Sequence, residues 1–107
     1  MSIEVIMKKI LLLCAAGMST SMVVKKMRES AEQKGLDIHI EAHGVETIQD
    51  YLSEYDLFLL GPQIRFKKDE LQKLADEVNK KVEVIDMMDY GMMKGEKILN
   101  DALALLD

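Results

Sequence analysis

The chain has 107 residues, a length typical of one domain, and its single cysteine excludes an intramolecular disulfide. Its net charge of −5 argues against nucleic acid as a main partner, because binding a phosphate backbone needs a clustered basic face. No apolar run approaches the ~20 residues that span a bilayer. We therefore expect a cytoplasmic domain that does not insert into a membrane.

The first predicted strand covers residues 8–13, K-K-I-L-L-L, whose unbroken apolar run indicates burial on both faces of a sheet. A helix is predicted to follow from Met18 to Lys34, and Gly35 stands where a glycine commonly ends a helix. The buried side of this helix is expected to carry, at three- and four-residue spacing, Val23, Met27, Ser30 and Ala31.

The middle of the chain predicts two further strands of different kinds. Residues 37–43, D-I-H-I-E-A-H, alternate apolar and polar side chains, which is typical of an edge strand covered on one face only. Residues 46–52 predict a short helix. A second unbroken apolar run at residues 56–60 predicts another central strand, which Gly61 and Pro62 end.

The last part of the chain predicts two helices around a short strand. The first helix is predicted from Lys68 to Lys80, and residues 82–85 predict an edge strand. Asp86 to Gly91 is predicted to be a methionine-rich loop, and the final helix to run from Met92 to Leu106. The buried side of the first helix is expected to carry Leu71, Leu74, Ala75 and Val78.

Alternating strands and helices predict an α/β fold with parallel strands and crossover helices. Because the two unbroken strands belong in the centre and the other two at the edges, we predict a four-stranded sheet of order 2-1-3-4. Helices on both faces then give three layers, α/β/α. In this order the chain reverses direction beside strand 1, so the carboxyl end of strand 1 lies at the switch point where open α/β sheets bind ligands.

Cys14 follows the first predicted strand directly and is therefore the leading candidate for a functional residue. Small and hydroxyl residues come after it: Ala15, Ala16, Gly17, Met18, Ser19, Thr20 and Ser21. Backbone N–H groups of such a loop, with the positive end of the helix dipole, favour a bound anion and ionisation of the thiol. We predict a thiolate nucleophile inside a phosphate-binding loop formed by residues 15–21. The alternative is an inert, buried cysteine.

The loops after the third and fourth strands are expected to flank Cys14, because parallel strands end at the same edge. Gln63 could hydrogen-bond a phosphoryl oxygen or a partner, or be a solvated amide. Tyr90 could reach the site through its hydroxyl, or be an ordinary packed tyrosine. We interpret Asp86 and Asp89 as turn or cap residues, since a carboxylate beside an anion would repel it.

The methionines and histidines complete the candidate residues. We interpret His39 and His43 as exposed and uninvolved, and no metal site is predicted, because one cysteine and two dispersed histidines give no ligand spacing. Six methionines form either an adaptable apolar rim around the thiol or part of the core: Met18, Met22, Met87, Met88, Met92 and Met93.

A cysteine that opens a phosphate loop after the first strand resembles the low-molecular-weight tyrosine phosphatases, whose pattern is C-x-x-x-x-x-R. Here the sixth residue after Cys14 is Thr20, so no guanidinium at that position clamps the phosphoryl group or offsets charge in the transition state. We therefore predict that the loop holds a thiophosphate but hydrolyses it poorly. The expected chemistry is reversible relay of a phosphoryl group from one donor to another acceptor.

Three motifs, K-K-I-L-L-L-C-A-A-G-M-S-T-S, L-L-G-P-Q-I-R-F and I-D-M-M-D-Y-G-M-M-K-G, resemble the IIB component of the lactose/cellobiose (chitobiose) branch of the bacterial phosphoenolpyruvate-dependent sugar phosphotransferase system (PTS). The resemblance implies one IIB domain over residues 1–107, with residues 1–7 as an N-terminal extension. It implies that Cys14 is phosphorylated by a phosphohistidine of the IIA component. The phosphoryl group then passes to a disaccharide of cellobiose, lactose or chitobiose type, bound by the membrane IIC component during uptake.

This scheme requires no cofactor and no metal, and we expect the isolated protein to be a monomer. Two other classes of function stay open. One is an enzyme related to the low-molecular-weight tyrosine phosphatases or to arsenate reductase, which would hydrolyse a small aryl phosphate. The other is a non-catalytic, flavodoxin-like binding module with a structural cysteine, in which Cys14→Ser would leave function unchanged.

Overall fold

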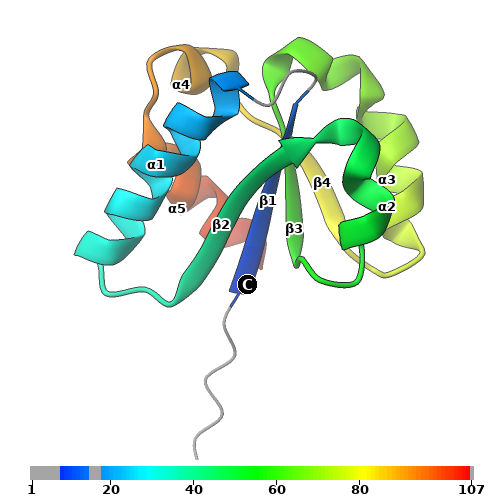
Figure 1. Ribbon diagram of the computed structural model, residues 1–107, viewed down its shortest axis with the longest axis horizontal. Coiled ribbons are helices and arrows are strands. Elements are labelled where there is room, and N and C mark those ends of the chain that lie inside the picture. The colour runs from blue at the N-terminus through cyan, green and yellow to red at the C-terminus, as the bar shows by residue number, and fades with distance from the viewer. Residues whose placement is uncertain (1–7, 15–17, 107) are drawn as a thin grey trace, which may run out of the picture.

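A four-stranded parallel sheet forms the centre of the molecule (Figure 1). The computed structural model describes residues 8–14 and 18–106, and for residues 18–20 only the backbone. The strands are β1 (Lys8–Cys14), β2 (Ile38–Gly44), β3 (Leu57–Leu60) and β4 (Lys81–Val84). Their order is β2-β1-β3-β4 and all pairs are parallel, which confirms the predicted topology.

Helices cover both faces of this sheet and complete the three layers. The α-helices are α1 (Met18–Gln33), α2 (Ile48–Tyr51), α3 (Lys68–Asp76), α4 (Met87–Gly91) and α5 (Gly95–Leu106). Two 3₁₀ segments, η1 (Val45–Thr47) and η2 (Pro62–Lys67), precede α2 and α3. Among the described residues no helix is both long and apolar enough to cross a bilayer.

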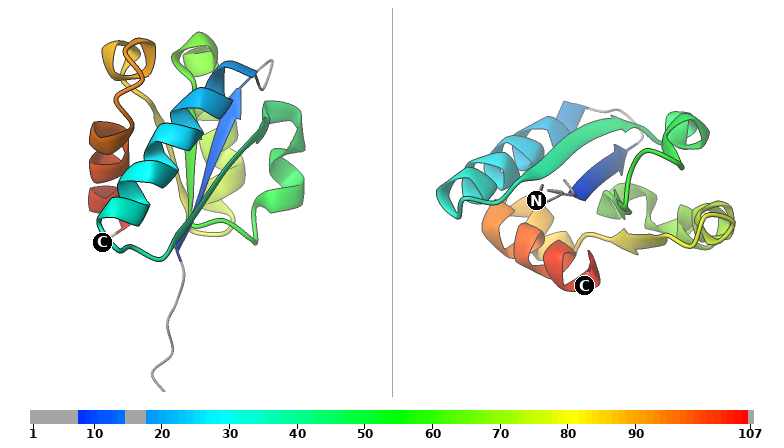
Figure 2. Two further views of the ribbon diagram at one scale, coloured as in Figure 1. Left: turned by 60° about the vertical axis from the view of Figure 1, so that its left-hand side comes forward. Right: turned by 90° about the horizontal axis from the view of Figure 1, so that it is seen from below.

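The core consists of two apolar clusters, one on each side of the sheet. In β1, Ile10 and Leu12 belong to the cluster under α1 and α5, whereas Leu11 and Leu13 belong to the cluster under α2 and α3. Figures 1 and 2 show these helix pairs on opposite sides of the strands. The four β1 side chains have no exposed surface, as their unbroken apolar run predicted.

The buried side of α1 and its end agree with the prediction. Its predicted buried residues, Val23, Met27, Ser30 and Ala31, are all buried. Gly35 has φ +66°, and the Leu36 N–H donates to the Ala31 carbonyl at 2.9 Å, which together form the left-handed turn that commonly ends a helix.

Two predicted helix boundaries are wrong, and the same left-handed turn explains both. Helix α3 ends at Asp76 rather than Lys80, because Asn79 adopts φ 58° and turns the chain; Val78 is consequently exposed. Met93 does the same with φ 52°, so the last helix begins at Gly95 rather than Met92. The N–H of Lys80 donates to the Ala75 carbonyl, and the N–H of Lys94 donates to the Asp89 carbonyl; these bonds close the two turns.

The segment after β4 also differs from the prediction, because residues 87–91 form helix α4 and not a loop. Asp86 caps this helix: its carboxylate accepts from the backbone N–H groups of Met88 at 3.0 Å and Asp89 at 3.1 Å. The predicted cap role of Asp86 is therefore confirmed, and this cap is the local reason why a helix forms here.

Candidate functional site

Cys14 is the last residue of β1 and lies at the carboxyl edge of the sheet, where strand order reverses. Gly44 is its register partner in β2. On the other side, the backbone N–H of Gly61 donates to the Leu13 carbonyl at 3.0 Å, so the residue after β3 continues the ladder beside the end of β1. This places the only cysteine of the chain between two glycines.

The approach of Gly61 to Cys14 is close. A Cβ on Gly61 would lie 3.7 Å from the Cys14 Cβ and 2.8 Å from Gln63 Oε1. Gln63 therefore folds its amide back towards Gly61, and Gly61 lies against the cysteine. This geometry brings the predicted residue Gln63 to the neighbourhood of Cys14, as expected from the shared edge of the strands.

Burial of Cys14 is greater than the sequence led us to expect for a nucleophile. The residue is 3% exposed and has no disulfide partner among the described residues. The predicted loop residues Ala15, Ala16 and Gly17 lie outside the described residues, as do the side chains of Met18, Ser19 and Thr20. The predicted phosphate-binding loop therefore stays a prediction.

The start of α1 is near Cys14 in the chain. The helix begins at Met18, four residues after the cysteine, and has 16 residues. Ser21, in its first turn, is exposed. The positive end of the helix dipole therefore lies four residues after Cys14 in the chain, and such a helix end favours an anion.

A groove of about 330 Å³ lies between η2 and α4 at this edge. We call it the η2–α4 groove, and its lining residues are Pro62, Gln63, Arg65, Met87, Tyr90 and Gly91. It brings together the predicted residues Gln63 and Tyr90. Gln63 is exposed, whereas Tyr90 is 8% exposed and packs into the cluster under α1 and α5.

Arg65 is the groove residue that the sequence analysis missed. It is exposed, and its Nη1 donates to the Pro62 carbonyl at 3.0 Å. The sequence analysis placed only Gly61, Pro62 and Gln63 in the loop after the third strand. The structure instead has the helical segment η2 there, which brings Arg65 back towards Pro62. The useful signal was proline directly after a strand-ending glycine, because proline favours the first position of a helix.

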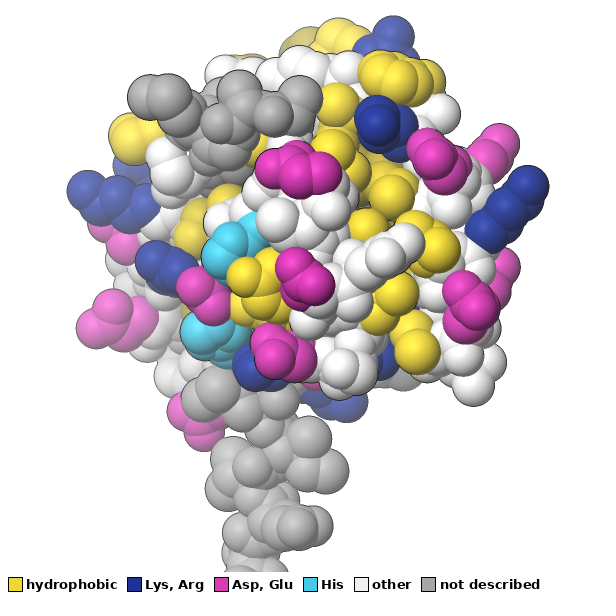
Figure 3. Space-filling model, turned by 45° about the vertical axis from the view of Figure 1, so that its right-hand side comes forward, with side chains coloured by type: hydrophobic (Ala, Val, Ile, Leu, Met, Phe, Trp, Pro, Cys, Tyr) yellow, Lys and Arg dark blue, Asp and Glu magenta, His cyan; other side chains and the backbone are white. Residues whose placement is uncertain are grey.

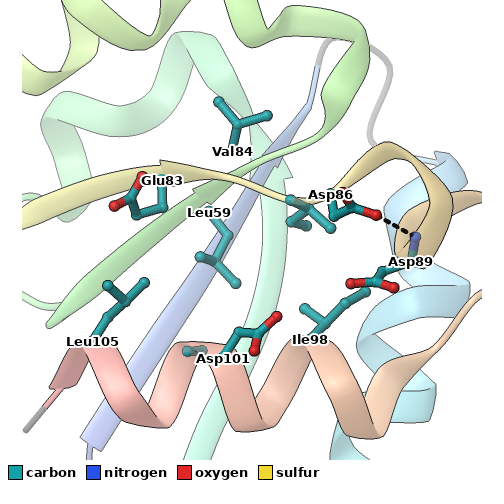
Figure 4. Close-up of a pocket in the computed structure, with 10 residues that line it drawn as sticks. Leu59, Glu83, Val84, Asp86, Asp89, Ile98, Asp101 and Leu105 are labelled. Atoms are coloured by element: carbon teal, nitrogen blue, oxygen red, sulfur yellow. Dashed lines mark hydrogen bonds between the residues drawn. The ribbon is translucent and has the colours of Figure 1, made fainter.

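Asp89 is not the turn residue that we predicted. It is 4% exposed, and its Oδ2 accepts from Lys97 Nζ at 2.9 Å. Hydrogen bonds from Lys97 to Asp89 and then to Asp101 raise the pKa of that lysine. Figure 4 shows Asp86, Asp89 and Asp101 around a small cavity of about 60 Å³ between β4 and α5. The pairing compensates the buried charge of Asp89.

The methionines predicted to form either a rim or part of the core are exposed wherever their side chains are described; the Met18 side chain lies outside the described residues. Five of them are 41–67% exposed: Met22, Met87, Met88, Met92 and Met93. Met87 lines the η2–α4 groove, and Phe66, in the same η2 segment as Arg65, is 75% exposed. The surface around the carboxyl edge is thus rich in large, flexible apolar side chains.

The histidines are half-buried rather than exposed, and both make contacts within the fold. His39 Nε2 lies 2.5 Å from Glu41 Oε2, which also accepts from the Tyr55 hydroxyl at 2.8 Å. His43 stacks on Tyr51 with ring centroids 4.5 Å apart. The hydrogen bond from Tyr55, followed by that from His39, lowers the pKa of the Glu41 carboxyl. Both histidines are visible in Figure 3, and these contacts attach edge strand β2 to α2 and to the segment before β3.

A family model described as "PTS system, Lactose/Cellobiose specific IIB subunit" matches residues 9–101 of the chain. The chain belongs to this IIB family. IIB components are sugar phosphotransferase subunits that work with IIA and IIC components. Across the described residues, no group of three His, Cys, Asp or Glu side chains is placed to hold a metal ion.

Known proteins resemble this IIB chain over nearly all of its length. The oligo-beta-mannoside-specific EIIB component of Bacillus subtilis (strain 168) is 50% identical over 100 residues, which cover 94% of this chain and 97% of that protein. The lactose-specific EIICB component of Staphylococcus aureus is 24% identical over 98 residues, which cover 92% of this chain and 16% of that longer protein.

Solved structures confirm the fold. The lactose-specific IIB component domain from Streptococcus pneumoniae superposes with a TM-score of 0.86 at 21% identity, covering 94% of this chain and 99% of that one. A low molecular weight phosphotyrosine phosphatase from Vibrio cholerae O395 superposes with a TM-score of 0.61 at 15% identity, covering 91% and 97%. The predicted likeness to the phosphatase fold is therefore confirmed.

Proposed function

We propose that this IIB protein is a phosphocarrier in which Cys14 accepts a phosphoryl group from a phosphohistidine of the IIA component. Cys14 then passes the group to a disaccharide of cellobiose, lactose or chitobiose type that the membrane IIC component holds during uptake. The protein acts as a monomeric cytoplasmic domain. The observation that carries the proposal is the position of the only cysteine at the carboxyl end of central strand β1, beside the start of α1.

Two aspects of the structure support Cys14 as the acceptor. It lies at the switch point of the sheet, the position at which open α/β sheets bind ligands. Gly44, the last residue of β2, and Gly61, directly after β3, lie beside Cys14, so the neighbouring backbone comes close to the cysteine on both sides.

The reaction is two in-line transfers through one sulfur. The Cys14 thiolate attacks phosphorus, an S–P bond forms, and the N–P bond to the donor imidazole breaks with the electron pair returning to nitrogen. A sugar hydroxyl oxygen then attacks the same phosphorus, the S–P bond breaks, and the thiolate is regenerated as the hydroxyl proton is lost to solvent or to a base of the acceptor complex. Because Thr20 stands where the phosphatases have arginine, water competes poorly with the sugar hydroxyl for the phosphoryl group.

Burial of Cys14 sets a condition on this scheme. At 3% exposure Cys14 is almost entirely buried, so we expect contact with the donor to increase its exposure before the imidazole reaches the sulfur. Partners are implied by the family and by a relative named as a combined EIICB component. We infer that the disaccharide is recognised mainly by the IIC component.

The test is an intact-mass measurement after incubation with phosphoenolpyruvate, the general phosphotransferase proteins and a IIA component. We expect a gain of one phosphoryl group that is sensitive to acid and to thiol reagents. Cys14→Ser is the matched variant, since it keeps the size of the side chain and removes the nucleophile, and we expect it to gain nothing. A phosphoryl group that survives this substitution would move the acceptor elsewhere and refute the proposal.

A further inference from the structure

The η2–α4 groove has an uneven distribution of charge. Its lining consists of the apolar or small residues Pro62, Met87, Tyr90 and Gly91, the amide Gln63, and one charged residue, Arg65. Pro62 directly follows Gly61, which lies against Cys14. The positive charge of Arg65 therefore belongs to the segment that borders the cysteine.

The guanidinium of Arg65 is held in place but keeps donors for a ligand. One nitrogen, Nη1, donates to the Pro62 carbonyl at 3.0 Å, which turns the side chain back over the start of η2. A guanidinium has five N–H donors in a planar fork that suits phosphate oxygens, and Arg65 is exposed. This one bond turns the guanidinium towards Pro62, and its other N–H groups can meet an anion.

Nearby acidic residues already have partners of their own. Asp86 accepts from the backbone N–H groups at the start of α4, and Asp89 is paired with Lys97. A carboxylate engaged by other donors competes less for the guanidinium. The chain as a whole carries a net charge of −5, so a doubly charged phosphoryl group that approaches Cys14 meets overall repulsion that a local cation offsets.

We propose that Arg65 is a positioning residue that binds oxygens of the phosphoryl group carried by the IIA phosphohistidine and directs it along the η2–α4 groove to Cys14. This inference rests on the proposed function. The S–P bond forms and the N–P bond breaks as described above, and the guanidinium takes no part in either change. Arg65 comes from the segment after β3 and not from the residues that follow Cys14, so it assists the encounter with the donor without the clamp that phosphatases use for hydrolysis.

The experiment measures the second-order rate constant of phosphoryl transfer from phosphorylated IIA to the full chain at several salt concentrations. Arg65→Gln removes the charge, and Lys81→Gln is the matched control, because Lys81 is exposed at the opposite end of the strands. A +1 and a −2 charge roughly 10 Å apart in water correspond to about a four-fold effect, so we expect Arg65→Gln to slow transfer about three- to ten-fold at low salt. The loss should shrink as salt is added.

Arg65→Lys and the lifetime of the phosphocysteine separate this role from a structural one. Lysine restores the charge but not the planar fork, so we expect it to recover part of the rate, while the hydrolytic lifetime of the phosphorylated protein stays unchanged. Equal rates for Arg65→Gln and Lys81→Gln would overturn the proposal. So would a loss that neither salt nor lysine alters. If the unsubstituted chain accepts no phosphoryl group on Cys14, the proposed function itself fails; if it does and Arg65→Gln transfers normally, only this inference fails.

Discussion

The contact of α5 with α1 depends on a glycine, and Gly95→Ala is therefore expected to lower the free energy of unfolding. A Cβ on Gly95 would lie 2.5 Å from the carbonyl carbon and from the Cβ of Lys26, and 2.7 Å from the Met27 nitrogen. Most of these are backbone atoms of α1, which cannot rotate away. The two helices must separate by about 1 Å to reach ordinary van der Waals contact.

The size of the loss in unfolding free energy depends on the core packing between α1 and α5 that this separation disturbs. Met27 of α1 and Leu99 of α5 have no exposed surface, and both belong to the cluster under these helices. Overpacking of such a core costs about 1–3 kcal/mol, and we expect the upper part of this range because the obstacle is backbone. For a domain of this size that corresponds to a fall in Tm of roughly 8–20 °C.

Urea denaturation of the purified variants measures this effect, and Gly91→Ala is the matched control. Gly91 is also helical, but a Cβ there meets nothing within 4 Å, so alanine should be neutral or stabilise by about 0.5–1 kcal/mol. Equal denaturation midpoints for the two variants would refute the reasoning. Because α1 begins four residues after Cys14, we also expect Gly95→Ala to accept phosphoryl groups more slowly.

The remaining predictions concern pH, hydrolysis and a helix end. The pKa of Glu41 is held below its usual 4.5, first by the Tyr55 hydrogen bond, so the contribution of Glu41 to stability is complete above about pH 4.5 and is lost as pH falls through the lowered pKa. Glu41→Gln should therefore reduce the loss of stability at acidic pH in urea titrations, and Glu70→Gln, an exposed control, should not. Thr20→Arg restores the phosphatase pattern and should shorten the lifetime of the phosphocysteine by mass measurement, whereas an unchanged lifetime would make loop geometry or a missing general acid decisive. Met93→Gly relieves a φ of 52° and should stabilise by about 1 kcal/mol, and a lower urea midpoint would contradict this.

Strand order was predictable from the sequence because burial leaves a direct mark on composition. The unbroken runs of β1 and β3 reflect strands covered on both faces, and the alternation of β2 reflects an edge strand of which Ile40 is buried in the core. Placing Cys14 at the switch point followed from that order alone. The convergence of Gln63 and Tyr90 at one groove followed from parallel strands sharing an edge.

Helix ends and the surroundings of the site were harder to predict. Asn79 and Met93 end helices in the left-handed conformation that sequence analysis assigns to glycine, so the boundaries near them were wrong. Arg65 was missed because its place in the groove depends on η2, a short helical segment without an amphipathic pattern. His39 meets Glu41 within β2, but Tyr51 and Tyr55, which contact His43 and Glu41, come from α2 and from the segment before β3. Contacts between elements distant in the chain leave no local pattern.

The sheet also acts as a partition between two independent layers. Consecutive side chains of β1 alternate between them, so each layer is assembled from its own set of residues: Ile10 and Leu12 on one side, Leu11 and Leu13 on the other. Substitutions without shared neighbours act almost additively, so one layer can diverge and repack while the other keeps the strands in register. The fold that this chain shares with the Vibrio cholerae phosphatase at 15% identity therefore does not require one particular set of side chains in either layer.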